Sequence, residues 1–346
     1  MNKRKQQVVR RRRMILCLGV LMVFASVFGL CAMKSDPYPA LKIPEGFYQP
    51  QLFSQVQLDD DLRLANLPVQ HEDTVLKHRL ETLMAQYSPN LKTHLFYYNI
   101  QNKNYVAINS ETPVAAASVI KLPILMEYLR EVDAKHVDFN TPLLYQSFEQ
   151  AGGSGELQYT PPGKTLMAFN VARQMIQISD NTCTNMLIYS LGGAEHLNRM
   201  FEGMGLRHTY VSNWLPDLTG TNMVSMQDTA TILYNLYLGH GISPMARQTA
   251  FEILTGTHNR RLLPALLPKG TMIAHKTGDI GTSLGNSGLI ELPNGQSYIV
   301  AVQVERPYND YSAKDMIQRM SKTIYDDVKD GNSLASANNS SNVTRL

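Results

Sequence analysis

Residues 115–121 read AAASVIK and place the hydroxyl of Ser118 three positions before the amine of Lys121. An apolar run with helical spacing follows, and residues i and i+3 lie on one face of a helix. We therefore expect the Lys121 amine beside the Ser118 oxygen. A serine is a weak nucleophile until a neighbouring base removes its proton, and a buried lysine kept neutral is such a base. Because a Ser-x-x-Lys pattern is common by chance, the rest of the chain decides whether this pair is catalytic.

Hydrophobic spacing predicts helices at both ends of a folded domain and a long helical region within it. Helical spacing begins at residue 74, dominates residues 165–255, and returns over 313–328. Strand signals fall at residues 94–100, 105–108, 271–275, 289–292 and 298–304, with an Asn-Gly turn before the last. This order predicts an α+β fold, in which terminal helices flank an antiparallel sheet and an all-helical lobe is inserted. A cleft between the lobes is the expected ligand site.

The first 34 residues predict a membrane segment. Basic residues near the start precede an apolar run over 14–33, and twenty helical residues span roughly 30 Å, the thickness of a bilayer core. We interpret residues 1–34 as a cytoplasmic basic start with a single-pass signal anchor; the alternative is a cleaved signal peptide, which would make the protein secreted. In both cases the remainder is predicted to be extracytoplasmic. It comprises a Pro-containing linker (35–70), a folded domain (71–330) and a Ser/Asn-rich tail expected to be disordered (331–346).

The charge of the chain argues against a nucleic-acid-binding protein, and its cysteine content argues against a disulfide-stabilised one. Residues 1–34 hold eight Lys and Arg and no acidic residue, which leaves 24 basic and 29 acidic side chains, a net charge of −5, for the rest. This mildly acidic body gives no case for a nucleic-acid partner. Cys183 is the one cysteine after residue 34, so an intramolecular disulfide is impossible there, and we expect a small buried residue. No cofactor and no metal are expected.

Two short motifs follow Ser-x-x-Lys in the chain: Ser-Asp-Asn at 179–181, between two predicted helices, and Lys-Thr-Gly at 276–278, at the end of a predicted strand. Each tripeptide is rare by chance in a chain of this length. The ordered set is found in class A β-lactamases and penicillin-binding proteins. The chain is similar to this β-lactamase-like superfamily from about residue 74 to residue 330, and the segments YTP at 159–161 and WLPDL at 214–218 extend the likeness in family order.

The resemblance implies roles in acylation for the motif residues. Ser118 attacks a carbonyl carbon, and Lys121 accepts the serine proton. Ser179 and Lys276 relay that proton to the leaving nitrogen. The backbone N–H groups of Ser118 and Asp279 form the oxyanion hole that stabilises the developing negative charge.

The resemblance also implies a set of substrate-binding residues. Thr277 and Ser179 bind a substrate carboxylate, and Asn181 binds a substrate amide. Tyr159 forms a wall of the cleft. Gly278 has no side chain, so that the substrate lies along the strand edge.

The chain departs from class A β-lactamases in two places. In those enzymes a loop glutamate activates the water for deacylation. The matching loop here, 213–219, places Leu215 at the glutamate position and Thr219 at the position of its partner asparagine. Leucine accepts no proton, and Asn185, which contacts the glutamate in the family, lacks that partner. The second departure is Ser287 or a neighbour, where β-lactamases usually carry an arginine that binds the drug's carboxylate.

Both departures fit the type A penicillin-binding proteins, which are D,D-peptidase-like relatives of class A β-lactamases. The leading hypothesis is a membrane-anchored serine hydrolase that acts on D-alanyl-D-alanine stem peptides of peptidoglycan, is acylated by β-lactams and is slow to deacylate. The first alternative is a class A β-lactamase that deacylates by another route. The second is a non-hydrolytic penicillin-binding sensor, against which the intact acylation residues argue.

Overall fold

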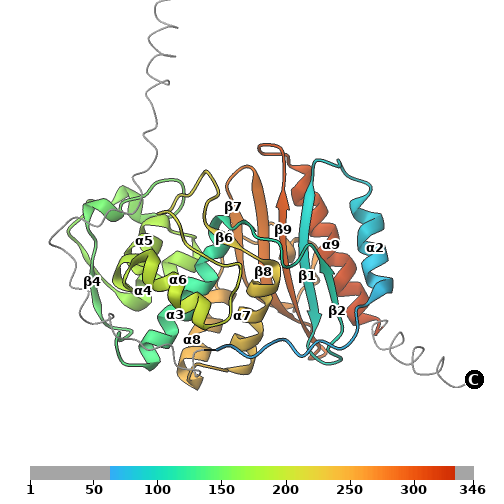
Figure 1. Ribbon diagram of the computed structural model, residues 1–346, viewed down its shortest axis with the longest axis horizontal. Coiled ribbons are helices and arrows are strands. Elements are labelled where there is room, and N and C mark those ends of the chain that lie inside the picture. The colour runs from blue at the N-terminus through green and yellow to red at the C-terminus, as the bar shows by residue number, and fades with distance from the viewer. Residues whose placement is uncertain (1–62, 332–346) are drawn as a thin grey trace, which may run out of the picture. The chain divides into compact units, whose positions relative to one another are not determined.

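The computed structural model describes residues 63–331 (Figure 1). The predicted membrane segment (14–33), most of the predicted linker and the predicted tail from residue 332 lie outside the described residues. Within the described range, no helix combines the length and the apolar character needed to cross a membrane.

A five-stranded sheet and two groups of helices make up the described chain (Figure 1). The α-helices are α2 (Thr74–Met84), α3 (Lys121–Asp133), α4 (Ala168–Gln177), α5 (Asn181–Ser190), α6 (Gly193–Gly203), α7 (Met226–Leu238), α8 (Pro244–Thr255) and α9 (Ser312–Lys329). The short 3₁₀ turns are η3 (Ala117–Ile120), η4 (Ser147–Glu149), η5 (Leu157–Tyr159) and η6 (Leu263–Leu266). The strands of the main sheet are β1 (Lys92–Asn99), β2 (Tyr105–Ile108), β7 (Met272–Asp279), β8 (Ser283–Glu291) and β9 (Ser297–Glu305). Two small strand pairs are β3 (Val114–Ala115) with β6 (Met223–Val224), and β4 (Pro142–Leu144) with β5 (Thr165–Met167).

The main sheet is antiparallel, with strand order β2-β1-β9-β8-β7, and both of its faces are covered. Figure 1 shows α2 and α9 on one side of the sheet and the helical lobe on the other. Successive side chains of a strand point to opposite faces. On β1, Leu95 and Tyr97 therefore join the core under α2 and α9, whereas Phe96 and Tyr98 join the core of the helical lobe. The structure confirms the predicted α+β fold with its inserted helical lobe.

The first half of β8 is a strand that the sequence pattern did not predict. The predicted strand begins at Leu289, but β8 begins at Ser283. The missed residues include two glycines, which are unfavourable in strands. Their small size is required here, because a Cβ at Gly285 would lie 1.7 Å from Gln303 Oε1, and one at Gly288 would lie 2.9 Å from the His275 Cβ.

The segment before α2 also packs on the domain, within the range predicted to be a linker. The side chain of Leu64 is buried, and its backbone N–H donates to the carbonyl of Met204 at 3.2 Å. The side-chain amide of Asn235 pairs with both backbone polar groups of Ala65 at 2.9 Å. The helical lobe thus binds the chain from residue 64 onward.

Candidate active site

A cleft of about 460 Å³ opens where β7 passes the turn η3 and the segment between α4 and α5. Its lining includes Ser118, Ser179, Asn181, Leu215, Thr277, Gly278, Asp279 and Arg306. The structure thus brings residues from all three sequence motifs to one cleft.

Ser118 lies in the 3₁₀ turn η3, and Lys121 is the first residue of α3. The Ser-x-x-Lys helix was predicted as one element, but its first turn is 3₁₀, in which residues i and i+3 are nearly eclipsed. Ala117 has a φ of 47°, in the left-handed region that non-glycine residues rarely adopt. Such strain concentrates at functional sites, where the surrounding structure holds it. Here the backbone of Ala116 is held by its N–H, which donates to the Asn222 carbonyl at 2.8 Å.

Ser179 links the two buried lysines of the site. Its Oγ lies 3.1 Å from Lys121 Nζ and 3.0 Å from Lys276 Nζ, and both amines donate to it. Ser179 also has a left-handed φ, 58°, so its backbone is strained as well. Lys121 Nζ further donates to the Ser179 carbonyl at 2.7 Å and to Asn181 Oδ1 at 2.9 Å. This arrangement makes a continuous path for a proton between the two amines through one hydroxyl.

Burial favours the neutral form of both amines. Lys121 and Lys276 have no exposed surface. Loss of hydration, and secondarily the charge of Lys276, holds the pKa of Lys121 well below its usual value. Loss of hydration lowers the pKa of Lys276 to about 7. In the neutral form Lys121 keeps two N–H donors for its three acceptor atoms on Ser179 and Asn181, and its free lone pair can accept the serine proton.

The middle residue of the Ser-Asp-Asn motif has a structural role. Asp180 is the N-cap of α5, where its Oδ1 accepts from the Cys183 N–H at 2.9 Å. Its Oδ2 accepts from the backbone N–H groups of Glu156 and Leu157, each at 2.8 Å. Asp180, the residue after Ser179, thereby ties the start of α5 to the segment at Glu156 and Leu157. Cys183 is buried, as predicted, and burial raises the pKa of its thiol, so it is unreactive.

The Lys-Thr-Gly strand packs directly against the nucleophile. A Cβ at Gly278 would lie 3.0 Å from both the Ser118 nitrogen and the Ala117 Cβ. Glycine is therefore needed for β7 to approach the Ser118 backbone, in addition to the predicted role of leaving the strand edge open. Ser118 and Asp279, whose N–H groups were predicted as the oxyanion hole, both line the cleft.

Arg306 supports this edge of the cleft, and the sequence analysis did not identify it. Its side chain is 2% exposed, and its guanidinium contacts Asp279 Oδ1 at 2.5 Å and donates to the Gly281 carbonyl at 2.8 Å. Ser287 is buried and pairs with Lys276 across β7 and β8. It stands near the position where β-lactamases usually carry the arginine that binds the drug's carboxylate. No local pattern marks Arg306, because it reaches Asp279 only through the pairing of β7 with β8 and of β8 with β9.

The predicted substrate-binding residues divide into two groups. Asn181, Thr277 and Gly278 line the cleft. The Asn181 amide is held within the protein, because its Nδ2 donates to the Gly152 carbonyl at 2.8 Å. Tyr159, predicted as a cleft wall, is 82% exposed at the end of η5 and is not among the residues that line the cleft, where Gly153 and Ser154 lie instead.

Leu215 lines the cleft, and the side chain of Asn185 fixes its backbone. The Asn185 side chain accepts from the Leu215 N–H and donates to its carbonyl, each at 2.9 Å. Leu215 itself is 4% exposed and lines the cleft. Thr219 does not line it; its hydroxyl donates to Asp217 Oδ1 at 3.2 Å. The nearby carboxylate of Asp217 is also engaged by the Thr221 hydroxyl and the Asn222 N–H, so it shapes the loop.

The sheet, the helical lobe, the two lysines joined by Ser179 and the adjoining cleft that Ser118 lines define a serine hydrolase. The chain belongs to the family described as the Beta-lactamase enzyme family, whose family model matches residues 75–328. Among solved structures, PBP-A is 38% identical with a TM-score of 0.74, and the match covers 77% of this chain and all of PBP-A. A leucine-to-glutamate variant of PBP-A, an acyl-enzyme complex with penicillin G, matches equally well in identity and TM-score.

Curated relatives are more distant in sequence. The extended-spectrum β-lactamase PER-1 of Pseudomonas aeruginosa is 27% identical over 210 residues, which cover 54% of this chain and 66% of PER-1. The β-lactamase ROB-1 of Haemophilus influenzae is 22% identical over 276 residues, which cover 75% of this chain and 88% of ROB-1. These comparisons confirm the predicted superfamily, with likeness both to a penicillin-binding protein and to β-lactamases.

Proposed function

We propose that this protein is a penicillin-binding serine hydrolase that is acylated at Ser118 and deacylates slowly. The natural substrates in this proposal are peptidoglycan stem peptides ending in D-alanyl-D-alanine, and β-lactams act as their mimics. The observation that carries the proposal is Leu215, an apolar side chain lining the same cleft as Ser118. The family resemblance places at this position the glutamate that β-lactamases use for deacylation.

The cleft holds what acylation requires. Neutral Lys121 takes the proton of the Ser118 hydroxyl as the serine oxygen bonds to the carbonyl carbon of the substrate. The resulting oxyanion is stabilised by the N–H groups of Ser118 and Asp279. When the carbon–nitrogen bond breaks, the Ser179 hydroxyl gives its proton to the leaving nitrogen and regains one from the Lys121 ammonium. Ser179 Oγ lies within hydrogen-bonding distance of Lys121 Nζ, which supports this relay.

Deacylation needs a water molecule with a base beside it, held against the acyl carbonyl. Leu215 supplies no base, and its side chain is apolar. The nearest acidic residue of the loop, Asp217, already accepts three hydrogen bonds from its own loop. The acyl-enzyme is therefore expected to persist. The acyl-enzyme complex of the PBP-A variant with penicillin G supports penicillin as a ligand for this fold and site.

A class A β-lactamase is the second candidate, because PER-1 and ROB-1 carry that name. The two candidates differ in the lifetime of the acyl-enzyme and in peptide cleavage. A fluorescent penicillin should label the full-length protein, and the label should be lost slowly after removal of free drug. Release of D-alanine from a D-alanyl-D-alanine peptide supports the peptidase. Rapid loss of label with no peptide cleavage supports the β-lactamase, and lasting label with no cleavage supports a sensor.

The proposal includes a location at the membrane. The apolar run over residues 14–33 and the basic residues before it support a single-pass anchor with the domain outside the cytoplasm. There the domain would meet peptidoglycan. Protease added to the outer face of intact cells, after permeabilisation of an outer membrane if one is present, should digest the domain. A domain that fractionates with cytosolic proteins contradicts this location.

A further inference from the structure

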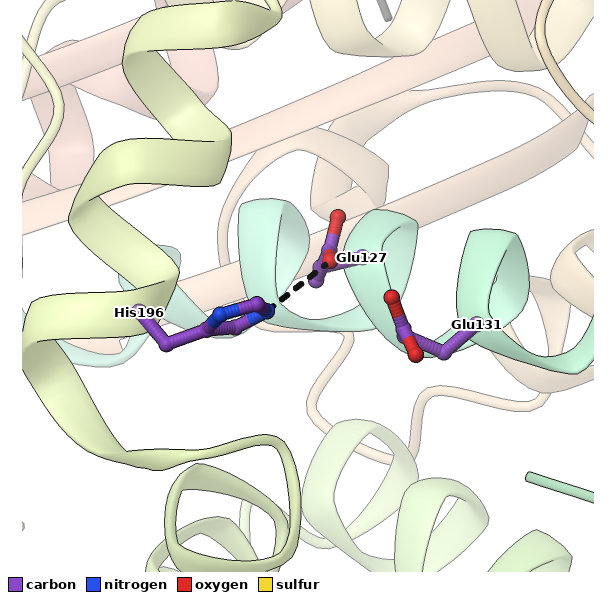
Figure 2. A group of neighbouring side chains, drawn as sticks. All are labelled: Glu127, Glu131 and His196. Carbon is purple, nitrogen blue, oxygen red and sulfur yellow. Dashed lines mark ion pairs between the residues drawn. The ribbon is translucent and has the colours of Figure 1, made fainter. Parts of the chain in front are cut away.

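A second cluster of functional side chains lies inside the helical lobe (Figure 2). Glu127 and Glu131 are one turn apart on α3, so they share one face of that helix, and His196 extends toward them from α6. The side chains of Glu127, Glu131 and His196 are 0%, 6% and 2% exposed. One ligand atom from each residue lies within 4.8 Å of the other two, and His196 Nε2 is 3.8 Å from Glu127 Oε1. Two carboxylates and one imidazole thus surround a single point.

Within the described part of the chain, the carboxylate of Glu127 lacks the hydrogen bonds that a buried charged group normally has. Both of its carboxylate oxygens are buried, and neither has a hydrogen-bond donor among the described residues. A buried carboxylate without such donors is costly. A carboxylate oxygen of Glu131 also lies within 4.8 Å of one from Glu127, and two like charges at this distance repel each other. A bound cation would offset both the lost hydration and this repulsion.

The other charged groups near the cluster suit an ion site. The Nδ1 of His136 lies 2.9 Å from Glu131 Oε2, which leaves the other Glu131 oxygen for an ion. Outer partners of this kind orient the residues that ligate metals. His136 is 46% exposed, so it also marks the side from which an ion would enter. Arg130 also interacts electrostatically with both glutamates.

We propose that Glu127, Glu131 and His196 bind a divalent first-row metal ion, with Zn²⁺ as the best match. Carboxylate oxygen and imidazole nitrogen are ordinary zinc ligands, with bonds of about 2.0–2.2 Å. Tetrahedral bonds of that length separate ligand atoms by about 3.3–3.6 Å. The cluster therefore needs to contract by roughly 1 Å, a movement available to side chains. The ion would link α3, which begins at Lys121, to α6, and so stabilise the helical lobe that holds the active site.

The experiment uses full-length, untagged protein stripped of metal with a chelator. Zinc chloride is titrated by calorimetry, thermal unfolding is followed with and without zinc, and Co²⁺ is added as a spectroscopic substitute. We expect one zinc ion per chain and a rise in Tm of roughly 5–10 °C at about a hundred times the Kd. Glu127→Gln and His196→Gln should each weaken zinc binding at least about tenfold. Glu195→Gln is the matched control, because Glu195 lies next to His196 but is 91% exposed in a surface pair with Arg199, and it should bind zinc like the parent.

Three outcomes overturn the proposal. The first is a parent protein with no zinc isotherm and no zinc-dependent rise in Tm. The second is zinc binding that survives unchanged in both folded variants, which places the ion elsewhere. The third is a Co²⁺ spectrum of the parent protein without the intense visible bands of a four-coordinate ion. This result decides the question if the variants do not unfold cooperatively and their zinc binding cannot be interpreted.

Discussion

Asn185 holds the backbone of Leu215 through two hydrogen bonds, accepting from its N–H and donating to its carbonyl, each at 2.9 Å. Asn185 lies on α5, which begins at Asn181 of the Ser-Asp-Asn motif, so the position of Leu215 is tied to the helix that directly follows Ser179 and Asp180. The loop therefore presents an apolar side chain to the cleft in a defined place. The first prediction tests what that side chain does.

Leu215→Glu should raise the rate of penicilloyl-enzyme hydrolysis by about tenfold or more. A positioned general base is worth roughly a hundred- to ten-thousandfold, but the full gain is not expected, because Thr219 and Asp217 are bonded to each other and do not complete a water site. The rate is measured as release of bound penicillin after removal of free drug. Leu215→Gln is the matched control, because glutamine has nearly the same shape as glutamate but its amide is not a base. Equal release from the Glu and Gln variants would show that Leu215 does not occupy the water site.

Gly278→Ala should slow acylation by at least about tenfold while leaving the protein folded. The new Cβ would lie 3.0 Å from the Ser118 nitrogen, so β7 and the nucleophile must separate by a few tenths of an ångström. Small displacements of reacting groups have large effects on rate. Gly152→Ala is the control, because its Cβ would meet only the end of the Gln158 side chain at 3.5 Å. If stopped-flow acylation is unchanged in Gly278→Ala, the close approach of β7 is not needed for catalysis.

Lys121→Ala should slow acylation of Ser118 by at least about a hundredfold, the scale of losing a general base. The deletion also removes the hydrogen bonds from Lys121 Nζ to Ser179 and Asn181, so unfolding should be measured in parallel. A folded variant that is acylated as fast as the parent would remove Lys121 from the mechanism.

The rate of acylation should pass through a maximum with pH. Acylation needs Lys121 neutral, so the rate falls in acid as Lys121 gains a proton. Burial lowers the pKa of Lys276 to about 7, so above that pH Lys276 loses the charge that attracts a substrate carboxylate, and the rate falls again. Lys276→Arg keeps its charge in alkali and should move the alkaline decline upward by more than one pH unit. An alkaline decline that stays in place in this variant would assign it to another group.

The sequence predicted those parts of the protein that depend on local pattern. Aromatic-rich and other strand-like runs with turn signals placed most of the sheet, and the chemistry of serine and lysine marked residues that the fold brings to one cleft and the wall behind it. The glycine-rich start of β8 was missed, because its stability comes from close packing against Gln303 and not from strand propensity. The contact of Arg306 with Asp279 and the approach of His196 to Glu127 were also missed. Each joins residues far apart in the chain, and only the tertiary fold makes them neighbours.

The most direct test of the central claim is mass spectrometry of the full-length protein at successive times after a short exposure to penicillin. The account predicts one added penicillin mass per chain, located on Ser118 by peptide mapping, absent from Ser118→Ala, and still present long after free drug is removed. An adduct lost within seconds would contradict slow deacylation and favour a β-lactamase. A labelled Ser118→Ala protein would show that Ser118 is not the nucleophile.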